Sequence, residues 1–310
     1  MKVSIAVISY NAEETILETL ESIIGQTYEL TNLELVISDD CSKDNTILVV
    51  ENWLKTNKDK FYSTKLIKSE VNQGVSKNCN ASWKTCSSDW IKTIAADDIL
   101  LPNCILDNVN FVKKHPDTKI LFSYMEAFDT NTKEIIDIYP YKRNVDFFEK
   151  NAAEQYKILL KHSFNFAPTS FMNRKYLAKI GYADERFKLI EDLPLWLRFT
   201  SASIPLRFMH KITVKYRIGN SITSSTDKFA NINFEKQLVY LYKTYVFPNL
   251  KKKDIIFMLD KTIELNSKIF IAKLTGNKKN KLSKNLYRIT HLCRPYWYRS
   301  HLNTFLKNKT

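Results

Sequence analysis

The 310-residue sequence lacks the long apolar segments that mark membrane spans and secretion signals. No uninterrupted apolar run reaches the ~18 residues of a membrane-spanning helix. The N-terminus, MKVSIAVISYN, has one lysine and a short apolar run, without the longer apolar core and cleavage site of a signal peptide. We therefore expect a cytoplasmic protein in which this first apolar run forms a buried strand.

Cysteine is scarce and irregularly spaced. The five cysteines are an odd number, and none lies in a CxxC pair. This pattern argues against a disulfide framework or a zinc site and favours small buried side chains in a reducing compartment. They are Cys41, Cys79, Cys86, Cys104 and Cys293.

Two glycine-rich nucleotide motifs are also missing. The absence of GxxxxGK[ST] excludes a P-loop, and the absence of GxGxxG leaves a dinucleotide-binding fold unsupported. The sequence has neither an internal repeat nor a low-complexity segment. Any nucleotide site must therefore be built from other residues.

The net charge of +14 is distributed very unevenly along the chain. Residues 1–227 contain 29 basic and 29 acidic side chains, whereas residues 228–310 contain 18 basic and 4 acidic ones. Such a change in composition predicts a domain boundary, here near residues 220–228.

Apolar runs and helical patterns alternate over the first ~100 residues, which predicts a parallel α/β sheet with helices on both faces. Buried-type strands are expected at residues 3–8, 33–38 and 90–95. Ligands of such sheets bind beyond the carboxyl ends of the strands. Each of these three strands is followed there by polar or acidic residues, so we expect one site formed by the three ends. The middle section, 118–217, has a mixed pattern of a strand pair, helices and a late strand.

Two adjacent acids, Asp97 and Asp98, follow the strand at residues 90–95. A carboxylate pair at a strand end can bind Mg²⁺ or Mn²⁺, whose charge relieves their repulsion and would neutralise a nucleotide diphosphate. The alternative is that one of them caps the helix predicted to begin near Pro102. Both roles are compatible, since one acid can cap while the other faces a ligand.

Two further positions suggest nucleotide and acceptor chemistry. Asp40 could accept the N–H of a pyrimidine base while Tyr10 stacks on the ring, although Tyr10 alone fits a core aromatic equally well. Glu191 and Asp192 open an apolar helix. Acids are favoured there by the helix dipole, but a carboxylate at this place could also act as a general base toward an acceptor hydroxyl.

Together, six segments fall in the order and spacing of a known family. They are VSIAVISYN, LVISDDCSKDNT, NQGVSKNCN, WIKTIAADDIL, EDLPLWLR and YRIGNSIT. Over residues 1–225 the chain resembles the family 2 glycosyltransferases, which are inverting enzymes with a GT-A fold. The resemblance implies that residues 1–100 are a nucleotide-binding half and 101–225 an acceptor half, with 226–310 a helical basic appendage.

The resemblance also implies roles for individual residues. Nucleotide contacts are expected from Ser9, Tyr10, Asn11, Asp40, Lys77, Asp97 and Arg217. Asp97, helped by Asp98, would hold Mn²⁺ or Mg²⁺. Asp192 would be the catalytic base, with Glu191 and Trp196 at the acceptor. The implied reaction transfers a sugar from a nucleotide diphosphate, expected to be UDP, to a hydroxyl of a glycan or lipid-linked acceptor in bacterial surface-polysaccharide synthesis.

Three positions depart from the family pattern. Ala95 replaces the first acid of the metal motif, Cys79 replaces a common arginine, and Gly219 stands where a histidine often follows Arg217. Lys77 or Asn78 is expected to replace the missing arginine. These departures keep a second hypothesis open, a catalytically impaired nucleotide-sugar-binding or scaffold protein on the same fold.

The basic C-terminal region combines lysine and arginine with aromatic residues, and residues 253–274 and 284–306 fit amphipathic helices. Several interpretations compete: packing on the catalytic domain, peripheral attachment to the anionic inner face of the cell membrane, and self-association into a homo-oligomer. Nucleic-acid binding is the least favoured of these alternatives, and we expect no nucleic-acid partner.

Overall fold

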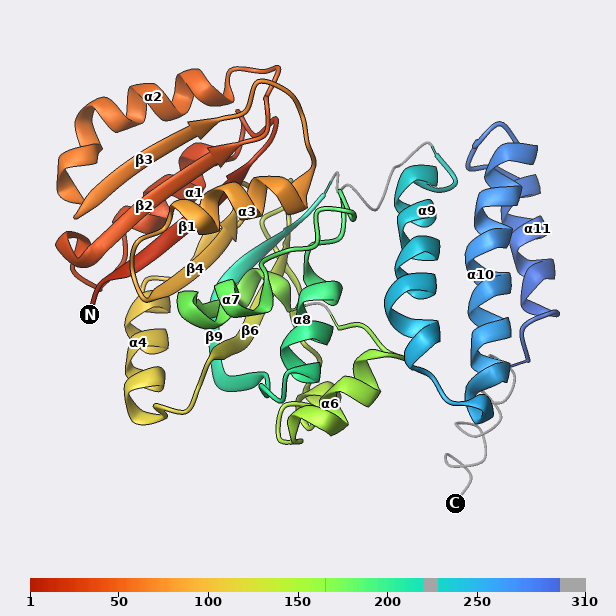
Figure 1. Cartoon of the computed structure of the whole chain (residues 1–310). Helices are drawn as coiled ribbons and strands as arrows, with labels where there is room; N and C mark the ends of the chain where they lie inside the picture. The colour runs from red at the N-terminus through yellow and green to blue at the C-terminus, as the bar shows by residue number, and fades with distance from the viewer. Residues whose placement is uncertain (165, 220–227, 296–310) are drawn as a thin grey trace. The chain divides into compact units, whose positions relative to one another are not determined.

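The computed structural model describes residues 1–164, 166–219 and 228–295, and the chain divides into two compact units, Met1–Gly219 and Asn220–Thr310 (Figure 1). The boundary predicted near residues 220–228 falls on a segment of which 220–227 lie outside the described residues. Each unit is described separately below.

The first unit is built on a nine-stranded sheet. Its strands follow the order β3-β2-β1-β4-β8-β6-β9-β5, and β7 pairs with β6. The first four strands are parallel, whereas β8 runs antiparallel to β4 and β6, and β5 antiparallel to β9. Their bounds are β1 Val3–Ser9, β2 Leu33–Asp39, β3 Ser63–Lys68, β4 Trp90–Ala95, β5 Ile99–Leu100, β6 Ile120–Asp129, β7 Ile135–Tyr139, β8 Phe171–Asn173 and β9 Arg207–Ile218.

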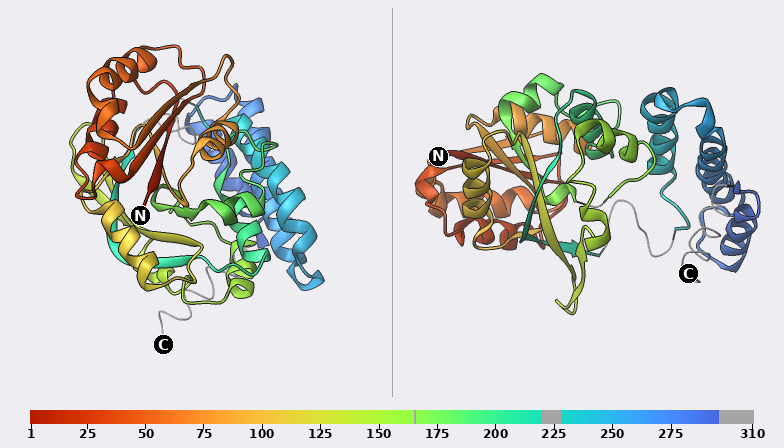
Figure 2. Two further views of the ribbon diagram at one scale, coloured as in Figure 1. Left: turned by 60° about the vertical axis from the view of Figure 1, so that its left-hand side comes forward. Right: turned by 90° about the horizontal axis from the view of Figure 1, so that it is seen from below.

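The described residues of this unit form eight α-helices between and around these strands. They are α1 Ile16–Ile24, α2 Thr46–Asn57, α3 Val75–Thr85, α4 Cys104–Lys114, α5 Lys142–Val145, α6 Ala152–Leu159, α7 Arg174–Ile180 and α8 Asp192–Ser201. Helix α7 ends at Gly181, which adopts φ of 90°, a conformation that glycine enters without steric cost. Figure 2 shows helices on both sides of the sheet.

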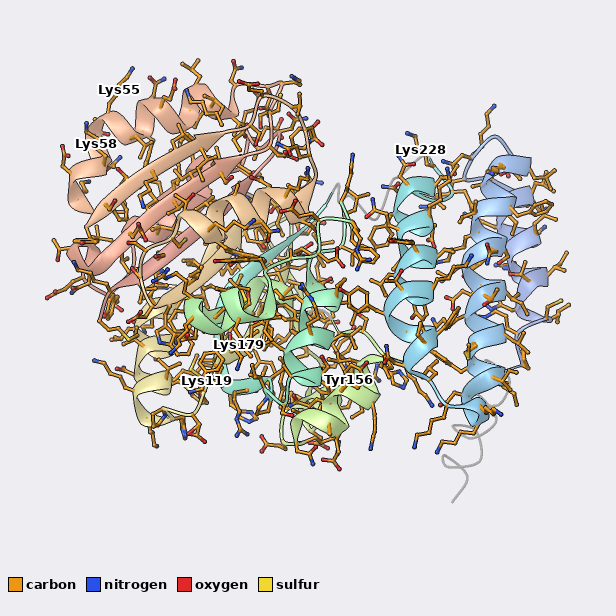
Figure 3. All side chains as sticks on the ribbon, viewed as in Figure 1. Lys55, Lys58, Lys119, Tyr156, Lys179 and Lys228 are labelled. Atoms are coloured by element: carbon orange, nitrogen blue, oxygen red, sulfur yellow. The ribbon has the colours of Figure 1, made fainter. Side chains whose placement is uncertain are left out.

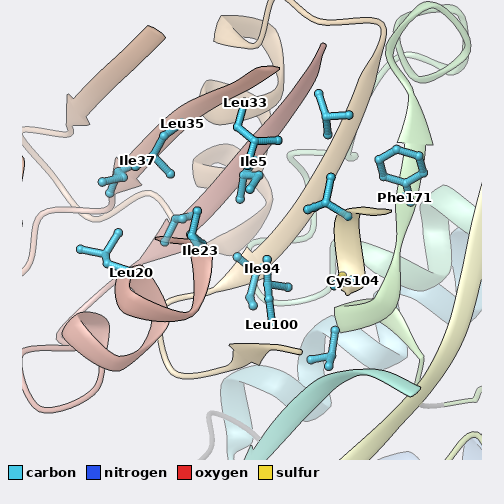
Figure 4. Packing of buried hydrophobic residues seen from close by; sticks show 14 of the residues in the cluster. Ile5, Leu20, Ile23, Leu33, Leu35, Ile37, Ile94, Leu100, Cys104 and Phe171 are labelled. Atoms are coloured by element: carbon cyan, nitrogen blue, oxygen red, sulfur yellow. The ribbon is translucent and has the colours of Figure 1, made fainter. Parts of the chain in front are cut away.

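The core follows from the alternation of side chains along the central strands. Ile5 of β1 and Leu35 of β2 lie on the face of the sheet that packs against Leu20 and Ile23 of α1 (Figure 4). Val7, two residues after Ile5, shares that face because side chains alternate along a strand. All five are fully buried. This core lies between the strands and the helices. It therefore holds the loops that connect them, which we call the rim loops where they follow β1, β2 and β4, at fixed positions.

The register of the parallel strands brings their carboxyl ends together. Ser9 pairs with Asp39 across β1 and β2, and Ile8 pairs with Ala95 across β1 and β4. The polar segments that follow these three strands therefore start from the same edge of the sheet, as the sequence predicts.

The second unit contains three α-helices among its described residues, α9 Ile232–Leu241, α10 Ile255–Leu274 and α11 Lys281–His291. The helix predicted over 253–274 matches α10. The one predicted over 284–306 corresponds in its first part to α11, and its end beyond residue 295 lies outside the described residues. Within the described part of the chain, no helix is long and apolar enough to cross a membrane.

Candidate active site

Asp40, directly after β2, organises the turn before α3. Its Oδ1 accepts the N–H of Gln73 at 2.8 Å, and its Oδ2 accepts the N–H of Gly74 at 2.7 Å. The side chain is almost fully buried. Each carboxylate oxygen has a second lone pair, so these bonds leave acceptor capacity for a ligand. Whether Asp40 contacts a base stays a prediction.

The turn at Gly74 lies in close contact with the loop before α8. Gly74 has φ of +92°, and a Cβ there would lie 2.5 Å from the carbonyl oxygen of Lys188. Nearby, the Nδ2 of Asn80 donates to the carbonyl of Ala183 at 3.0 Å, and the N–H of Ala183 donates to Oδ1 of Asn80 at 2.8 Å. Helix α3 and residues 182–190 are thus joined by the side-chain hydrogen bonds of Asn80, and the close approach of Lys188 requires glycine at position 74.

Helix α3 is also tied to the end of β1. The Nδ2 of Asn78 donates to the carbonyl of Ser9 at 3.0 Å, and the hydroxyl of Ser9 donates to Oδ1 of Asp39 at 3.2 Å. The Oδ1 of Asn78 is buried and has no hydrogen-bond partner among the described residues. Ser9 and Asn78 therefore help to position the loops at the carboxyl ends of the strands.

Tyr10 and Asn11 lie at the surface of the same rim. The Tyr10 side chain is 47% exposed, which leaves its ring available for stacking. The N–H of Asn11 donates to the hydroxyl of Ser42, and the N–H of Lys43 donates to Oδ1 of Asn11, both at 2.8 Å. Asn11 thus links the loops that follow β1 and β2. Tyr10 lies in the first of these two loops.

A hollow of about 210 Å³ opens beside these loops. Its lining includes Asp40, Gln73, Lys77 and Asn78. Lys77 is exposed, and its Nζ lies 3.2 Å from Oε1 of Gln73. The hollow therefore combines a carboxylate, amides and a cation that could reach a phosphate.

Asp97 and Asp98, on the turn between β4 and β5, differ sharply in environment. Asp97 is exposed, whereas Asp98 is almost fully buried. The N–H of Arg217 donates to Oδ1 of Asp98 at 2.9 Å, while Oδ2 has no hydrogen-bond partner among the described residues. Burial, followed by the charge of Asp97, raises the pKa of Asp98 well above its usual value. Asn103 occupies the N-cap position of α4 without a side-chain capping hydrogen bond, so neither acid caps this helix, contrary to the alternative drawn from the sequence.

Arg217, at the end of β9, holds this acidic turn from the other side. Its Nε donates to the carbonyl of Asp97 at 2.7 Å, and its Nη2 pairs with Glu18 of α1. The guanidinium also lies 4.7 Å from the ring centre of Phe128. Arg217 is therefore committed to contacts within the chain, and its predicted contact with a diphosphate stays a prediction.

The residues present fit a divalent cation only in part. Asp97 offers an exposed carboxylate, and Asp98 has one oxygen without a partner among the described residues. The described residues hold no cluster of three or more acids, histidines or cysteines that could bind a metal, and Ala95 supplies no ligand. Hard cations readily complete their shells with water and phosphate oxygens, so a single carboxylate can suffice when a diphosphate is bound.

Glu191 and Asp192 stand at the start of α8, where burial is the main cause that raises both pKa values. The pKa of Glu191 rises to about 8, with the charge of Asp192 as the second cause. In Asp192 the backbone N–H of Leu193, which donates to Oδ1 at 2.6 Å, counteracts the rise. Burial raises the pKa of the Cys79 thiol in α3, and the negative charges of Glu191 and Asp192 raise it further. Because Lys188, three residues before Glu191, lies against Gly74 at the start of α3, the acidic pair is close to that helix.

Trp196 occupies a different position from the one expected for an acceptor contact. It is 4% exposed, and its ring centre lies 4.9 Å from that of Phe122 in an edge-to-face arrangement. Its indole N–H is buried without a hydrogen-bond partner among the described residues. In this structure Trp196 is a core aromatic under α8, and its role at the acceptor stays a prediction.

Two residues at this site were not found from the sequence. Glu18 of α1 pairs with Arg217, and Lys92 of β4 is fully buried. The Nζ of Lys92 donates to the carbonyl of Pro168 at 2.7 Å, and its charge favours the ionised form of Asp98. In the sequence, the burial of Lys92 is indicated only by its position inside the apolar run WIKTIA. Glu18 cannot be distinguished there from other acids on the exposed face of a helix.

Comparison with known proteins identifies the family. Residues 4–181 match the model of glycosyl transferase family 2. The chain belongs to this family. Its relatives include the putative glycosyltransferase EpsE of Bacillus subtilis, 28% identical over 201 residues that cover 64% of this chain and 66% of EpsE. Another is the UDP-Glc:alpha-D-GlcNAc-diphosphoundecaprenol beta-1,3-glucosyltransferase WfaP of Escherichia coli, 26% identical over 74% of this chain and 82% of WfaP.

Solved structures confirm the GT-A-type fold of this family 2 member. S. aureus TarS 1-349 in complex with UDP-GlcNAc has a TM-score of 0.60 at 19% identity, covering 97% of this chain and 92% of that one. The mannosyltransferase PcManGT from Pyrobaculum calidifontis, in complex with GDP-Man and Mn²⁺, has a TM-score of 0.55 at 14% identity, covering 96% and 71%. In a longer TarS structure the chain spans 53% of the length.

Proposed function

We propose that this family 2 glycosyltransferase is an inverting enzyme that moves a sugar from a UDP-sugar to a hydroxyl of a glycan or lipid-linked acceptor. The observation that carries the proposal is the joining of both halves at one edge of the sheet. Asn78 and Asn80 of α3 bond to Ser9 on one side and to Ala183, in the loop before Asp192, on the other. The loops at the carboxyl ends of the strands and a half-buried acidic pair are thereby connected through a single helix.

The donor and acceptor classes rest on relatives rather than on geometry. WfaP is named for UDP-Glc and for a diphosphoundecaprenol acceptor, and one TarS structure holds UDP-GlcNAc. AmsE of Erwinia amylovora, 24% identical over 77% of this chain, is named for amylovoran biosynthesis. We propose by analogy that this chain builds a bacterial surface polysaccharide, and that it works in the cytoplasm at the inner face of the cell membrane.

In the proposed reaction, Asp192 takes the proton of the acceptor hydroxyl as the acceptor oxygen attacks the anomeric carbon. The bond from that carbon to the diphosphate oxygen breaks on the opposite face, and the diphosphate leaves with the electron pair. One displacement inverts the configuration. The raised pKa of Asp192 makes it a stronger base than a free carboxylate.

Other residues bind and orient. Tyr10 stacks on the base and Asp40 accepts its N–H, while Lys77 reaches a phosphate. Asp97, with Asp98 as its helper, would hold Mn²⁺ or Mg²⁺, and such an ion would stabilise the charge on the leaving diphosphate.

The test pairs binding with turnover. We expect UDP with Mn²⁺ to raise the melting temperature, and UDP-sugars to be hydrolysed or transferred. Asp192→Asn is expected to lower transfer by about 10²–10⁴-fold while UDP still raises the melting temperature, because only the base is removed. Asp59→Asn, at an exposed acid of the first unit, is the matched control and is expected to leave both readings unchanged.

Each outcome has a distinct meaning. A chain that UDP stabilises but that turns over no sugar would instead support the impaired nucleotide-sugar-binding or scaffold protein, a hypothesis that Ala95 and the sparse metal ligands favour. A chain that responds to no nucleotide sugar, in binding or in turnover, would refute the proposal.

A further inference from the structure

The second unit has an unusual distribution of polar and apolar side chains. Several ion pairs lie inside this unit, beside buried apolar side chains such as those of Leu241, Phe257 and Leu265. Arg294 pairs with Asp260 at 2.9 Å and with Glu264 at 2.8 Å, and Lys268 of α10 pairs with Glu235 of α9 at 3.1 Å. Charged groups that would ordinarily face water therefore lie between the helices.

Large apolar side chains of the same helices are exposed instead. Phe270 and Leu274 in the last two turns of α10 are 65% and 62% exposed. Leu282 in the first turn of α11 is 58% exposed, and Ile289 on the same face of that helix is 57% exposed. Ordinary soluble helices bury this face, so its exposure indicates a partner surface.

Exposed apolar residues also lie at the start of α10 and after the end of α11, and those nearest the turn between α10 and α11 lie in a segment that is rich in lysine. We call residues 270–284 the hairpin tip. The tip holds five lysines and no acid. All five are exposed; they are Lys273, Lys278, Lys279, Lys281 and Lys284. In α11, the apolar positions 282, 286 and 289 recur at helical spacing, and the basic positions 281, 284 and 288 form a row along the flank of that stripe.

We propose that the hairpin tip and the apolar stripe of α11 dock on an anionic lipid surface. An exposed apolar face flanked by lysines is the arrangement that inserts into the boundary between headgroups and acyl chains. Charge complementarity favours lipid over a second copy of this chain. The acids among the described residues of the second unit are Glu235, Asp254, Asp260 and Glu264. Glu235, Asp260 and Glu264 are committed to the ion pairs above, and the carboxylate of Asp254 accepts the N–H of Lys251. Two such basic tips would repel each other.

This inference deepens the proposed membrane location. It rests on the proposed function only for the reason why the protein would dock on a membrane. The surface itself is defined without reference to catalysis. Vesicle binding and the response to UDP are therefore independent measurements, and either can fail without the other.

The experiment measures sedimentation of the full chain with vesicles of phosphatidylcholine alone or with added phosphatidylglycerol. We expect binding to the anionic vesicles, weakened by salt, and little binding to the neutral ones. Phe270→Ser with Leu274→Ser is expected to lower the partition coefficient about tenfold or more, because two anchors are lost. Lys279→Gln, Lys281→Gln and Lys284→Gln together are expected to lower it roughly a hundredfold.

Matched controls come from the first unit. Leu48→Ser removes an exposed apolar side chain of α2. Replacing Lys55, Lys58 and Lys179 by Gln removes three exposed charges, and these lysines are labelled in Figure 3. Both controls are expected to bind vesicles as the unchanged chain does. The tip variants should keep the melting temperature of the unchanged chain, since the substituted side chains are exposed.

Three results would overturn the inference. The first is no binding to anionic vesicles. The second is equal loss in tip and control variants, which would indicate a non-specific attraction of the basic chain. The third is a stable dimer, measured by sedimentation, that the Phe270→Ser and Leu274→Ser changes dissociate while vesicle binding is unaffected, which would assign the face to a second copy.

Discussion

The backbone N–H of Arg217 donates to Oδ1 of Asp98 at 2.9 Å, although the two residues are 119 positions apart in the chain. The same arginine holds the carbonyl of Asp97 through Nε. One residue of β9 thus fixes the turn that carries both acids predicted to bind the metal. Changes in the contacts of this turn are therefore expected to affect nucleotide and metal binding.

Glu18 competes for the guanidinium of Arg217. If Arg217 contacts the diphosphate, the ion pair with Glu18 must weaken when the nucleotide binds. We therefore expect Glu18→Gln to tighten UDP binding about two- to fivefold, the equivalent of a partly exposed ion pair. Isothermal titration with UDP measures this. An unchanged or weaker affinity would mean that Arg217 only supports the turn.

Asp97 is the exposed carboxylate of the metal pair, so removing its charge should not harm folding. We expect Asp97→Asn to raise the Mn²⁺ concentration needed for half-maximal transfer by at least about tenfold, because a hard cation loses its protein carboxylate. The melting temperature without metal should stay within a degree or two. Ala95→Asp makes the opposite change, and we expect it to lower the Mn²⁺ requirement. Equal Mn²⁺ dependence in all three chains would contradict the assignment.

Glu191 makes the stability of the fold depend on pH. Its pKa of about 8 in the folded chain is well above the ordinary value of 4.5, so the folded state holds more protons between these values. The free energy of unfolding therefore falls as pH rises from about 4.5 to 8. Glu191→Gln removes this penalty. Since the side chain is partly exposed, we expect a gain of only ~1–2 kcal/mol at pH 8.5 and little change at pH 4.5. Urea unfolding at the two pH values measures it, and a larger gain at the acid pH would contradict the sign.

Lys92 is fully buried, and burial lowers the pKa of its ammonium group. Replacing it by Met keeps the aliphatic stem but leaves the carbonyl of Pro168 without this donor, and it removes one of the two positive charges, the other being Arg217, that favour the ionised form of Asp98. We expect Lys92→Met to lower the free energy of unfolding by ~1–3 kcal/mol, measured with urea at pH 7. Lys65→Met, at a half-buried lysine of β3, is a control with a smaller expected loss.

The nucleotide half was predictable from the sequence because its signals are local. Apolar β-branched runs and helical patterns alternate there. Ser9 ends β1, Asp40 directly follows β2, and Asp97 lies two residues after the end of β4. The parallel register then places them on one edge. Helix α8 was predictable for the same reason, since its apolar pattern begins right after Asp192.

Contacts between distant segments were not predictable. Nothing near Asp98 in the chain indicates that Arg217 supplies its hydrogen bond, or that Glu18 reaches the same arginine. Trp196 is a second example of an environment that distant segments determine. The family pattern suggests an acceptor contact, but the burial of its ring depends on Phe122 and Phe166, which belong to other elements.

The strand that holds the acidic turn is made late during synthesis. A ribosome that has translated β1 to β4 has already produced Asp98, but Arg217 has not yet been added to the nascent chain. A fragment ending at residue 181, where the family match stops, contains the parallel strands and lacks β9 altogether. Premature termination before residue 217 therefore yields chains whose acidic turn has no strand to pair with, so unfinished molecules in the cell would not present a completed rim.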